Sequence, residues 1–374
     1  MKNVFHIRMF FIATLLIILL LTACGYRPSV PPSRPLPEVL PELPSVYMVS
    51  TTYNTMVIGT DGSLWAEGFN INGELADGST IRRTFFDQVG TFTDWVHVDA
   101  GSNHIVAIRE DGRLWTWGGN RRGGLGNNTR ENSHVPVIIL IGRDRPWRTA
   151  AAGLGHTVAI QADGSLWAWG SSSSGQLGNG IAGGFDTDIL VPIQVGTDTD
   201  WAYVFAYWTR TMAIKTDGSL WGWGYNEHGD LGDGTREARP YPTLIQEGTS
   251  WATIALSSRH TLGIRTDGSL WAWGDNWNGQ LGDGTTTSRL SPVQVGTYTD
   301  WTDVAAGFGY TIAIRADGSL WVWGTHATLF FGDLAERDST IPTQIHPYEH
   351  WVSVAAGNNR AFAVTHDGRL LRLG

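Results

Sequence analysis

The chain has 374 residues with 47 glycines, 19 tryptophans, one cysteine and 16% charged residues, and its net charge is −9. Its 42% hydrophobic content is enough for a large core, which excludes a wholly disordered chain. A single cysteine excludes a disulfide framework and cysteine-based zinc sites, and the acidic balance lacks the basic footprint of a nucleic-acid-binding protein.

The first 23 residues are predicted to be a cleaved signal peptide. Lys2 and Arg8 form a positively charged start, and residues 9–21 form an almost unbroken apolar run. At ~1.5 Å per residue this run is too short to cross a membrane core of ~30 Å, so it is not expected to remain as a membrane span.

The apolar run ends in Leu-Thr-Ala-Cys24, which resembles the lipobox of bacterial lipoproteins. We expect Cys24 to carry acyl chains, palmitate among them, and to become the new N-terminus. The alternative is an ordinary secretory signal followed by an incidental cysteine. The acyl chains would anchor the protein to the cell membrane or outer membrane, facing outside the cytoplasm, and would be its only membrane contact.

A proline-rich segment follows the cysteine. Seven of the chain's fifteen prolines lie within residues 25–44. Such a composition favours extended polyproline II structure, so residues 24–35 are predicted to form the lipidated start and a semi-rigid stalk.

From residue 45 onward one unit repeats seven times. Its anchor is an Asp-Gly pair that recurs every 50 to 54 residues, at Asp61, Asp111, Asp163, Asp217, Asp267, Asp317 and Asp367. Seventeen of the nineteen tryptophans occupy fixed repeat positions, and the exceptions are Trp208 and Trp277. Aromatic residues this regular are expected to be structural.

Each repeat is predicted to form four short strands. In the fifth copy Trp251 opens the first strand, the Asp-Gly pair at Asp267 joins the second and third through a type I′ hairpin turn, and Pro292 starts the fourth. Four strands per copy in seven copies predict an all-β, seven-bladed β-propeller of four-stranded blades over residues 36–374. The seventh copy stops before a fourth strand, so residues 36–41 are expected to supply that strand and close the ring.

The repeat resembles that of the regulator of chromosome condensation family. The resemblance rests on Gly-x-x-His, Asp-Gly, Trp-x-Trp-Gly and Asn-x-x-Gly-Gln-Leu-Gly, as in His260, Asp267, Trp273 and Asn276, and covers roughly residues 36–374. It implies a seven-bladed propeller. Its best-known member is a nuclear exchange factor for a small GTPase, whereas secreted bacterial members include β-lactamase inhibitors that bind through the loops of one face.

No catalytic constellation is found in the sequence, so no enzyme activity, cofactor or metal is expected. His104, His156 and His260 share one repeat position, but other copies have Asn54, Arg210, Tyr310 and Arg360 there. A position that accepts such different side chains is interpreted as part of a hydrogen-bonding framework and not as a metal ligand.

The two faces of the propeller differ in sequence variability. The connections between first and second strands, and between third and fourth strands, share one face, which we call the loop face. The Asp-Gly turns and the segments between blades share the other, the turn face. The turn face is monotonous, and the loop face varies from copy to copy.

Aromatic residues replace small ones at several places on the loop face, and such residues typically anchor protein interfaces. The predicted contact residues are Trp208, Trp277, Phe308, Tyr207, Tyr310 and Asn359, with Arg121, Arg122 and Arg259 as polar contacts at the rim. The alternative is that these aromatic residues fill gaps between blades.

The sequence therefore predicts a lipid-anchored, monomeric, extracytoplasmic protein that binds another protein through its loop face. A first alternative is an inhibitor of a secreted or periplasmic enzyme, which would abolish the partner's activity at stoichiometric amounts. A second is carbohydrate or cell-wall binding or hydrolysis, which would require at least one essential carboxylate in the hydrolytic case.

Overall fold

A computed structural model describes residues 45–50, 53–141, 145–183, 187–325, 339–358 and 360–373. Contacts between Cα atoms divide the chain into two compact units, Met1–Leu36 and Pro37–Gly374, and every described residue belongs to the second. The described residues form strands and turns and contain no helix, and therefore no helix that could span a membrane.

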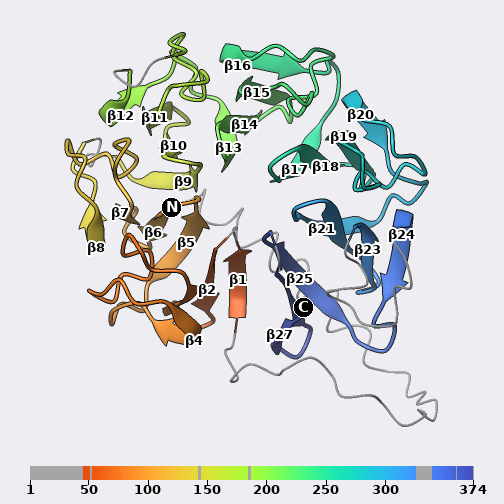
Figure 1. Cartoon of the computed structure of the whole chain (residues 1–374), viewed down its shortest axis with the longest axis horizontal. Helices are drawn as coiled ribbons and strands as arrows, with labels where there is room; N and C mark the ends of the chain where they lie inside the picture. Colours follow the sequence, from red (N-terminus) through yellow and green to blue (C-terminus); the bar gives the residue numbers. More distant parts are fainter. Residues whose placement is uncertain are drawn as a thin grey trace. The chain divides into compact units, whose positions relative to one another are not determined.

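The strands form seven antiparallel sheets, which follow one another around a ring (Figure 1). The first strand of each sheet lies nearest the centre of the ring. These first strands are β1 (Ser45–Ser50), β5 (Trp95–Ala100), β9 (Trp147–Ala152), β13 (Trp201–Tyr207), β17 (Trp251–Leu256), β21 (Trp301–Ala306) and β25 (Trp351–Ala356). The second strands are β2 (Asn54–Gly59), β6 (His104–Arg109), β10 (His156–Gln161), β14 (Arg210–Lys215), β18 (His260–Arg265), β22 (Tyr310–Arg315) and β26 (Ala361–Thr365).

The third and fourth strands complete each blade toward the rim. The third strands are β3 (Leu64–Gly68), β7 (Leu114–Gly118), β11 (Leu166–Gly170), β15 (Leu220–Gly224), β19 (Leu270–Gly274), β23 (Leu320–Gly324) and β27 (Leu370–Arg372). The fourth strands are β4 (Arg83–Gln88), β8 (Ser133–Ile138), β12 (Ile189–Gln194), β16 (Arg239–Ile245), β20 (Arg289–Gln294) and β24 (Ser339–Ile345).

This arrangement confirms the predicted seven-bladed propeller. Six blades contain four strands paired in sequence order, and the seventh contains three described strands, β25, β26 and β27. The expected closing strand at residues 36–41 lies outside the described residues, as do the predicted signal peptide, Cys24 and the stalk.

The Asp-Gly turns differ from the predicted type. The glycine has a positive φ, as at Gly112 with φ 77°, but Asp111 is not among the residues with positive φ, as a type I′ turn would require. Instead Gly112 N–H donates to Arg109 O (2.8 Å) and Arg109 N–H donates to Arg113 O (3.1 Å). The hairpin is therefore a three-residue connection, a type I turn followed by a left-handed glycine.

The side chains around the turn, which recur from repeat to repeat, form a local hydrogen-bond network. In the first blade Asp61 Oδ1 accepts from the backbone N–H (3.0 Å) and the hydroxyl (2.6 Å) of Ser63. Ser63 Oγ in turn accepts from Nε1 of Trp65 at 2.8 Å. These hydrogen bonds hold the pKa of Asp61 below its usual value. The recurrence of aspartate at this position is therefore explained by its role in the turn, as the sequence indicates.

Seven apolar clusters form the core, and each lies between two neighbouring blades. The second tryptophan of the third strand is central to most of them, and Trp117, Trp169 and Trp223 are completely buried. An isolated blade would expose these faces, so the ring must close for the core to form.

The ring closes by side-chain packing between the first and seventh blades. Phe86 of β4 contacts Phe362 of β26 edge to face, with ring centroids 6.3 Å apart. The buried carboxylate of Glu67 pairs with Arg372 at 2.6 Å and lies 3.5 Å from Arg360. These contacts join the first and seventh blades within the described residues.

Candidate functional site

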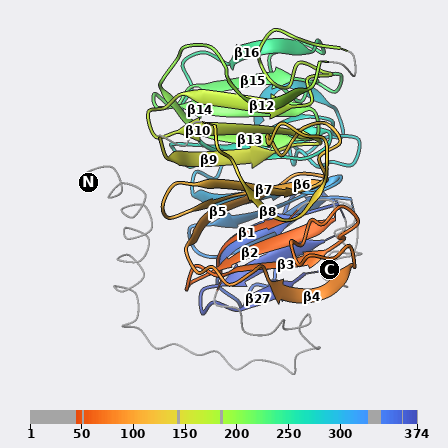
Figure 2. The same ribbon diagram turned by 90° about the vertical axis from the view of Figure 1, so that its left-hand side faces the viewer.

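The loop face consists of two sets of connections. The strands of the propeller run from one face of the ring to the other (Figure 2). Because they alternate in direction, the short connections at residues 101–103, 153–155, 208–209, 257–259 and 307–309 share a face with the long connections at 69–82, 119–132, 225–238 and 275–288. This is the grouping that the sequence predicts.

The long connections are held by a buried asparagine. Asn276 accepts from Leu281 N–H through Oδ1 (2.9 Å), and its amide donates to Asp283 Oδ1 (3.1 Å) and Thr285 O (3.0 Å). Gln280 Oε1 accepts from Asn278 N–H at 2.9 Å. These bonds fix the backbone on both sides of residue 277, so the loop presents that side chain from a rigid base.

Trp277 is the largest exposed side chain of this loop, with 74% of its surface accessible. The equivalent positions in other blades are Ile71, Arg121, Ser173 and Glu227. No structural rule of the repeat therefore requires an aromatic residue at this position. The alternative that Trp277 fills a gap between blades is excluded by its exposure.

Trp208 is held in an unfavourable backbone conformation. It lies between β13 and β14 with φ 52°, and 49% of its surface is exposed. Since Tyr207 pairs directly with Arg210, Trp208 is the first residue of a two-residue turn, where positive φ favours glycine. Its carbonyl accepts from Leu154 N–H of the preceding blade at 2.7 Å, which helps to hold the strained turn.

Phe308 is also exposed, at 46%, on the corresponding connection of the sixth blade. Its neighbour Tyr310 was predicted to contact a partner, but this prediction is wrong because Tyr310 is completely buried. The single proton of the Tyr310 hydroxyl is shared between Gly357 O (3.0 Å) and Arg360 O (2.8 Å) of the next blade, and burial raises the pKa of Tyr310. Tyr310 thus belongs to the framework.

The remaining predicted residues occupy different environments. Tyr207 is half-buried, and its hydroxyl reaches across the centre of the ring toward Asn358 Oδ1 of the seventh blade at 3.4 Å. Asn359 lies outside the described residues. Tyr207 therefore contributes to the connection between opposite blades and offers only part of its ring to a partner.

The predicted arginines lie on the loop face but in two groups. Arg121 is exposed, and Arg122 pairs with the buried carboxylate of Asp188 at 3.2 Å, which also pairs with Arg130 at 2.7 Å. Arg259 is exposed on the short connection of the fifth blade, the blade that also carries Trp277 and that follows the blade of Trp208. Only Arg259 thus accompanies the aromatic residues in neighbouring blades.

A buried ion pair beneath this region was missed by the sequence reasoning. Arg210 Nη1 lies 2.7 Å from Asp230 Oδ2, both side chains are buried, and Arg210 also donates to Ser257 O at 2.7 Å. Burial raises the pKa of Asp230 to about 6, opposed by the Arg210 guanidinium. The sequence does contain a sign of this pair, because the fourth repeat has Arg210 where three repeats have histidine and Asp230 where others have glutamine.

The first blade carries a second apolar region that was also missed. Tyr53 packs against Phe69 edge to face with centroids 5.3 Å apart, and the Arg82 guanidinium lies 4.8 Å above the Phe69 ring. Ile71 and Ile81 are exposed on the same long connection. Tyr53 was recognisable as one of the variable loop residues, but the ring contact depends on the fold.

The histidine position is confirmed as a structural framework. His104 Nε2 bonds to Thr157 Oγ1 of the next blade at 2.8 Å, and this hydroxyl donates to Gly124 O at 2.8 Å. Burial lowers the pKa of His104 to about 4 and that of His156 to about 3. No group of three or more His, Cys, Asp or Glu side chains arranged to hold a metal ion occurs within the described part of the chain.

Comparisons with known sequences identify a family. The model of the RCC1-like domain matches residues 24–363. The ultraviolet-B receptor UVR8 of Arabidopsis thaliana is 32% identical over 195 residues, which cover 51% of this chain and 43% of the receptor. The E3 ubiquitin-protein ligase HERC2 of Homo sapiens is 28% identical over 205 residues, which cover 53% of this chain and 4% of the ligase. The alignments thus span less than half the length of these relatives.

Solved structures share the fold. Prp20p of Saccharomyces cerevisiae superposes with a TM-score of 0.73 at 19% identity, covering 87% of this chain and 82% of that chain. Human WBSCR16 superposes with a TM-score of 0.76 at 20% identity, covering 92% of this chain and 94% of that chain. At these identities the similarity establishes the architecture alone.

Proposed function

The chain belongs to the RCC1-like domain family, and from this premise we propose that its propeller is a non-catalytic scaffold that binds another protein through the loop face. The binding residues would be Trp208, Trp277 and Phe308, with Arg259 beside them. These three aromatic residues come from consecutive blades, the fourth to the sixth. The protein is proposed to act as a monomer.

The observation that carries the proposal is the exposure of three large aromatic rings on connections that the framework holds in place. Burying such rings in an interface is favourable, at roughly 25 cal/mol per Å² of apolar surface, and aromatic residues dominate the binding energy of many interfaces. Leaving them in water has no structural benefit. Trp208 adds backbone strain to exposure, a combination that is typical of functional positions.

Relatives with this fold support protein binding as its use. Prp20p was solved in a study of its binding to Gsp1p and histones, and yeast RCC1 (Prp20) was solved bound to Kap60. These are properties of those proteins. They support the class of partner proposed here, a protein, and leave its identity to experiment.

The proposal includes an anchor outside the cytoplasm. The signal-like residues 1–23 and the lipobox at Cys24 support a lipoprotein of the cell membrane or outer membrane. Metabolic labelling with an alkyne analogue of palmitate should mark the wild-type chain and leave Cys24→Ser unmarked. Labelling of both proteins, or of neither, would contradict the anchor and leave the loop-face proposal standing.

Affinity capture with a matched control tests the binding face. The full chain, solubilised in mild detergent, is compared with a loop-face variant, Trp208→Ala, Trp277→Ala and Phe308→Ala. The control replaces three exposed aromatic residues outside the loop-face connections, namely Phe85, Tyr203 and Tyr348, by alanine. Both variants must first show the wild-type circular dichroism spectrum.

We expect one protein to be retained by wild type and control and lost by the loop-face variant. Its purified form should bind the chain at least tenfold more weakly when the three rings are removed. Equal binding by all three chains would refute the face assignment. If the partner is an enzyme, its loss of activity at an equimolar amount of the chain would identify the inhibitor alternative.

A further inference from the structure

The turn face contains a repeated aromatic and cationic unit. In four blades the last residue of the second strand is a cation that lies over the first tryptophan of the third strand. The distances from the charged group to the ring centroid are 6.0 Å for Arg109 and Trp115, 4.9 Å for Lys215 and Trp221, 3.5 Å for Arg265 and Trp271, and 5.7 Å for Arg315 and Trp321. In the second and sixth blades the cation lies closer still to a further ring, 3.9 Å from Phe92 for Arg109 and 3.7 Å from Tyr298 for Arg315. These distances lie within the range of cation–π attraction.

In three of these blades the cation is held by a carboxylate that directly precedes the tryptophan of the same blade's first strand. Arg109 pairs with Asp94 at 2.7 Å, and Arg315 pairs with Asp300 at 2.8 Å. Lys215 lies 3.1 Å from Asp200. The four units thus share two tryptophans and a cation, and three of them add an acid.

The third blade keeps the tryptophans and lacks the charges. Trp147 and Trp167 meet edge to face with centroids 6.1 Å apart, the same distance as Trp301 and Trp321 in the sixth blade. The cation position, however, is the buried Gln161, and the acid position is Pro146. Among the described residues no cation lies over the ring of Trp167.

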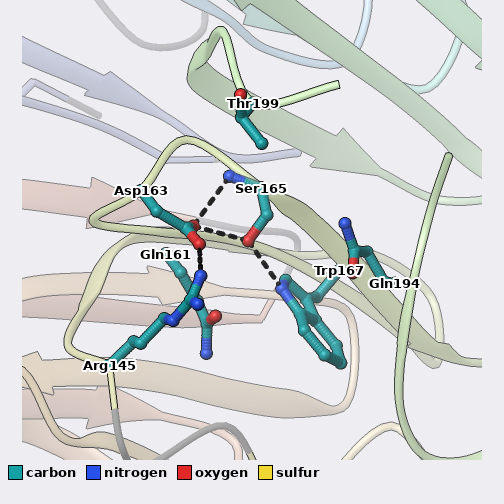
Figure 3. Close-up of a pocket in the computed structure, with 7 residues that line it drawn as sticks. All are labelled: Arg145, Gln161, Asp163, Ser165, Trp167, Gln194 and Thr199. Carbon is teal, nitrogen blue, oxygen red and sulfur yellow. Dashed lines mark hydrogen bonds and ion pairs between the residues drawn. The ribbon is translucent and has the colours of Figure 1, made fainter. Parts of the chain in front are cut away.

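An open pocket of about 350 Å³ lies beside this tryptophan, and the exposed Arg145 is part of its lining (Figure 3). The Trp167 ring borders it together with the side-chain amides of Gln161 and Gln194 and with Thr199. Trp167 Nε1 donates to Ser165 Oγ at 3.0 Å, and Ser165 Oγ donates to Asp163 Oδ1 at 2.7 Å. These bonds hold the indole ring in a fixed orientation before any ligand arrives.

We propose that this pocket binds an organic cation, an alkylammonium or guanidinium group, over the ring of Trp167. The ligand's charge would take the place that Arg109, Lys215, Arg265 and Arg315 take in their own blades. Asp163 adds a carboxylate at the rim, where it pairs with the exposed Arg145. Amide and hydroxyl oxygens of the lining accept hydrogen bonds from ammonium or guanidinium donors.

The charge environment favours such a ligand. On the turn face the linker acids Asp94, Asp198, Asp200 and Asp300 are paired with the cations of their own blades. The ion pairs of the described residues do not include four turn aspartates, Asp61, Asp217, Asp267 and Asp317, which leave negative charge on this face. A protein surface rich in one sign of charge raises the local concentration of oppositely charged ligands. The site is on the face opposite to the proposed protein-binding residues, so it stands or falls independently of them.

The test is a titration of the full chain labelled with 5-fluorotryptophan and observed by ¹⁹F NMR. Tetramethylammonium chloride is added against sodium chloride at equal ionic strength, because a quaternary ammonium isolates attraction to the ring from hydrogen bonding. Trp167→Phe identifies the Trp167 signal. We expect that signal to shift in a saturable way, while the tryptophans of the four charged units do not respond.

Two further probes separate the sources of the cation. Nα-acetyl-lysine amide and Nα-acetyl-arginine amide represent side chains of a protein, and tetramethylammonium represents a free small cation. Tighter binding of either amide than of tetramethylammonium would assign the site to a basic side chain. The reverse order would assign it to a small quaternary cation.

Restoring the missing charges supplies the decisive variant. Gln161→Arg with Pro146→Asp recreates the pair of the second and sixth blades and should weaken tetramethylammonium binding at least tenfold. The control Thr60→Arg adds the same charge to the exposed turn of the first blade and should leave binding unchanged. Should the double variant fail to fold, Gln161→Arg alone is measured.

Three results would overturn the proposal. They are a Trp167 signal that responds equally to sodium and tetramethylammonium, undiminished binding by the charge-restored variant, and saturation only after Arg145→Ala. The last would show that the chain's own arginine closes the pocket.

Discussion

The strain at Trp208 can be measured by comparing two substitutions at the same site. A non-glycine residue in the left-handed region lowers the free energy of unfolding by about 1–2 kcal/mol, and alanine at this position has the same strain as tryptophan. Glycine avoids it, although elsewhere glycine is about 0.5–1 kcal/mol less favourable than alanine. Trp208→Gly should therefore be more stable than Trp208→Ala by about 1 kcal/mol. The truncation of the ring is common to both variants and cancels in the comparison.

Phe308 provides the matched control, because it occupies the corresponding connection and is not among the residues with positive φ. There the order should reverse, with Phe308→Ala more stable than Phe308→Gly by about 0.5–1 kcal/mol. Urea denaturation followed by tryptophan fluorescence measures both differences. If the order at position 208 equals the order at position 308, Trp208 is not strained and the structural argument for its function fails. Both variants at 208 should bind the partner equally weakly.

The remaining predictions concern the framework that holds the loops. Thr311→Val removes one of two donors to the buried carbonyl of Gln280, at the loop of Trp277, and should cost about 2 kcal/mol of stability, whereas Thr311→Ser should cost less. His156 is neutral when folded, because its pKa falls from 6.5 to about 3, so its contribution is complete above pH 6.5 and is lost on acidification. His156→Asn should therefore reduce the stability lost between pH 8 and pH 5 by about 2 kcal/mol relative to wild type, measured by urea denaturation at both pH values. Arg372→Met removes the closest partner of the buried Glu67 and leaves its charge uncompensated, so it should speed proteolysis at the contact between the first and seventh blades. An unchanged cleavage rate would argue against this pair as part of the ring closure.

The fold was predictable because each repeat has the same strand and turn residues at nearly the same spacing. The spacing of Trp251, Asp267 and Trp273 is the spacing of a four-stranded blade, and seven copies remove the ambiguity of any single one. The fourth strand of the fifth blade, however, begins at Arg289, so Pro292 lies within it and does not start it. The histidine position was also interpretable, since a site that accepts Asn, Arg and Tyr cannot depend on metal ligation. The same comparison among copies gave the grouping of the two faces.

The errors arose where the environment of a side chain depends on its neighbours in the next blade. Tyr310 follows a variable connection, which suggested exposure, but its ring lies where a Cβ on Gly307 would be 2.0 Å from it, between the blades. The turn type was misjudged because Asp-Gly permits both a two-residue and a three-residue hairpin. The ion pair of Arg210 and Asp230 joins residues twenty positions apart, and a sequence alone does not show that they meet.

Both proposed sites depend on departures from the repeat, but for opposite reasons. On the loop face the fourth, fifth and sixth blades add large aromatic rings to a framework that does not need them, and the backbone of Trp208 is itself strained. On the turn face the third blade removes a cation and its acid from a unit whose aromatic pair remains in place. An added exposed ring and a vacated charge position each leave an interaction incomplete within the chain. Since four other blades supply the cation of the turn-face unit internally, these are the places where a ligand from outside gains the most by binding.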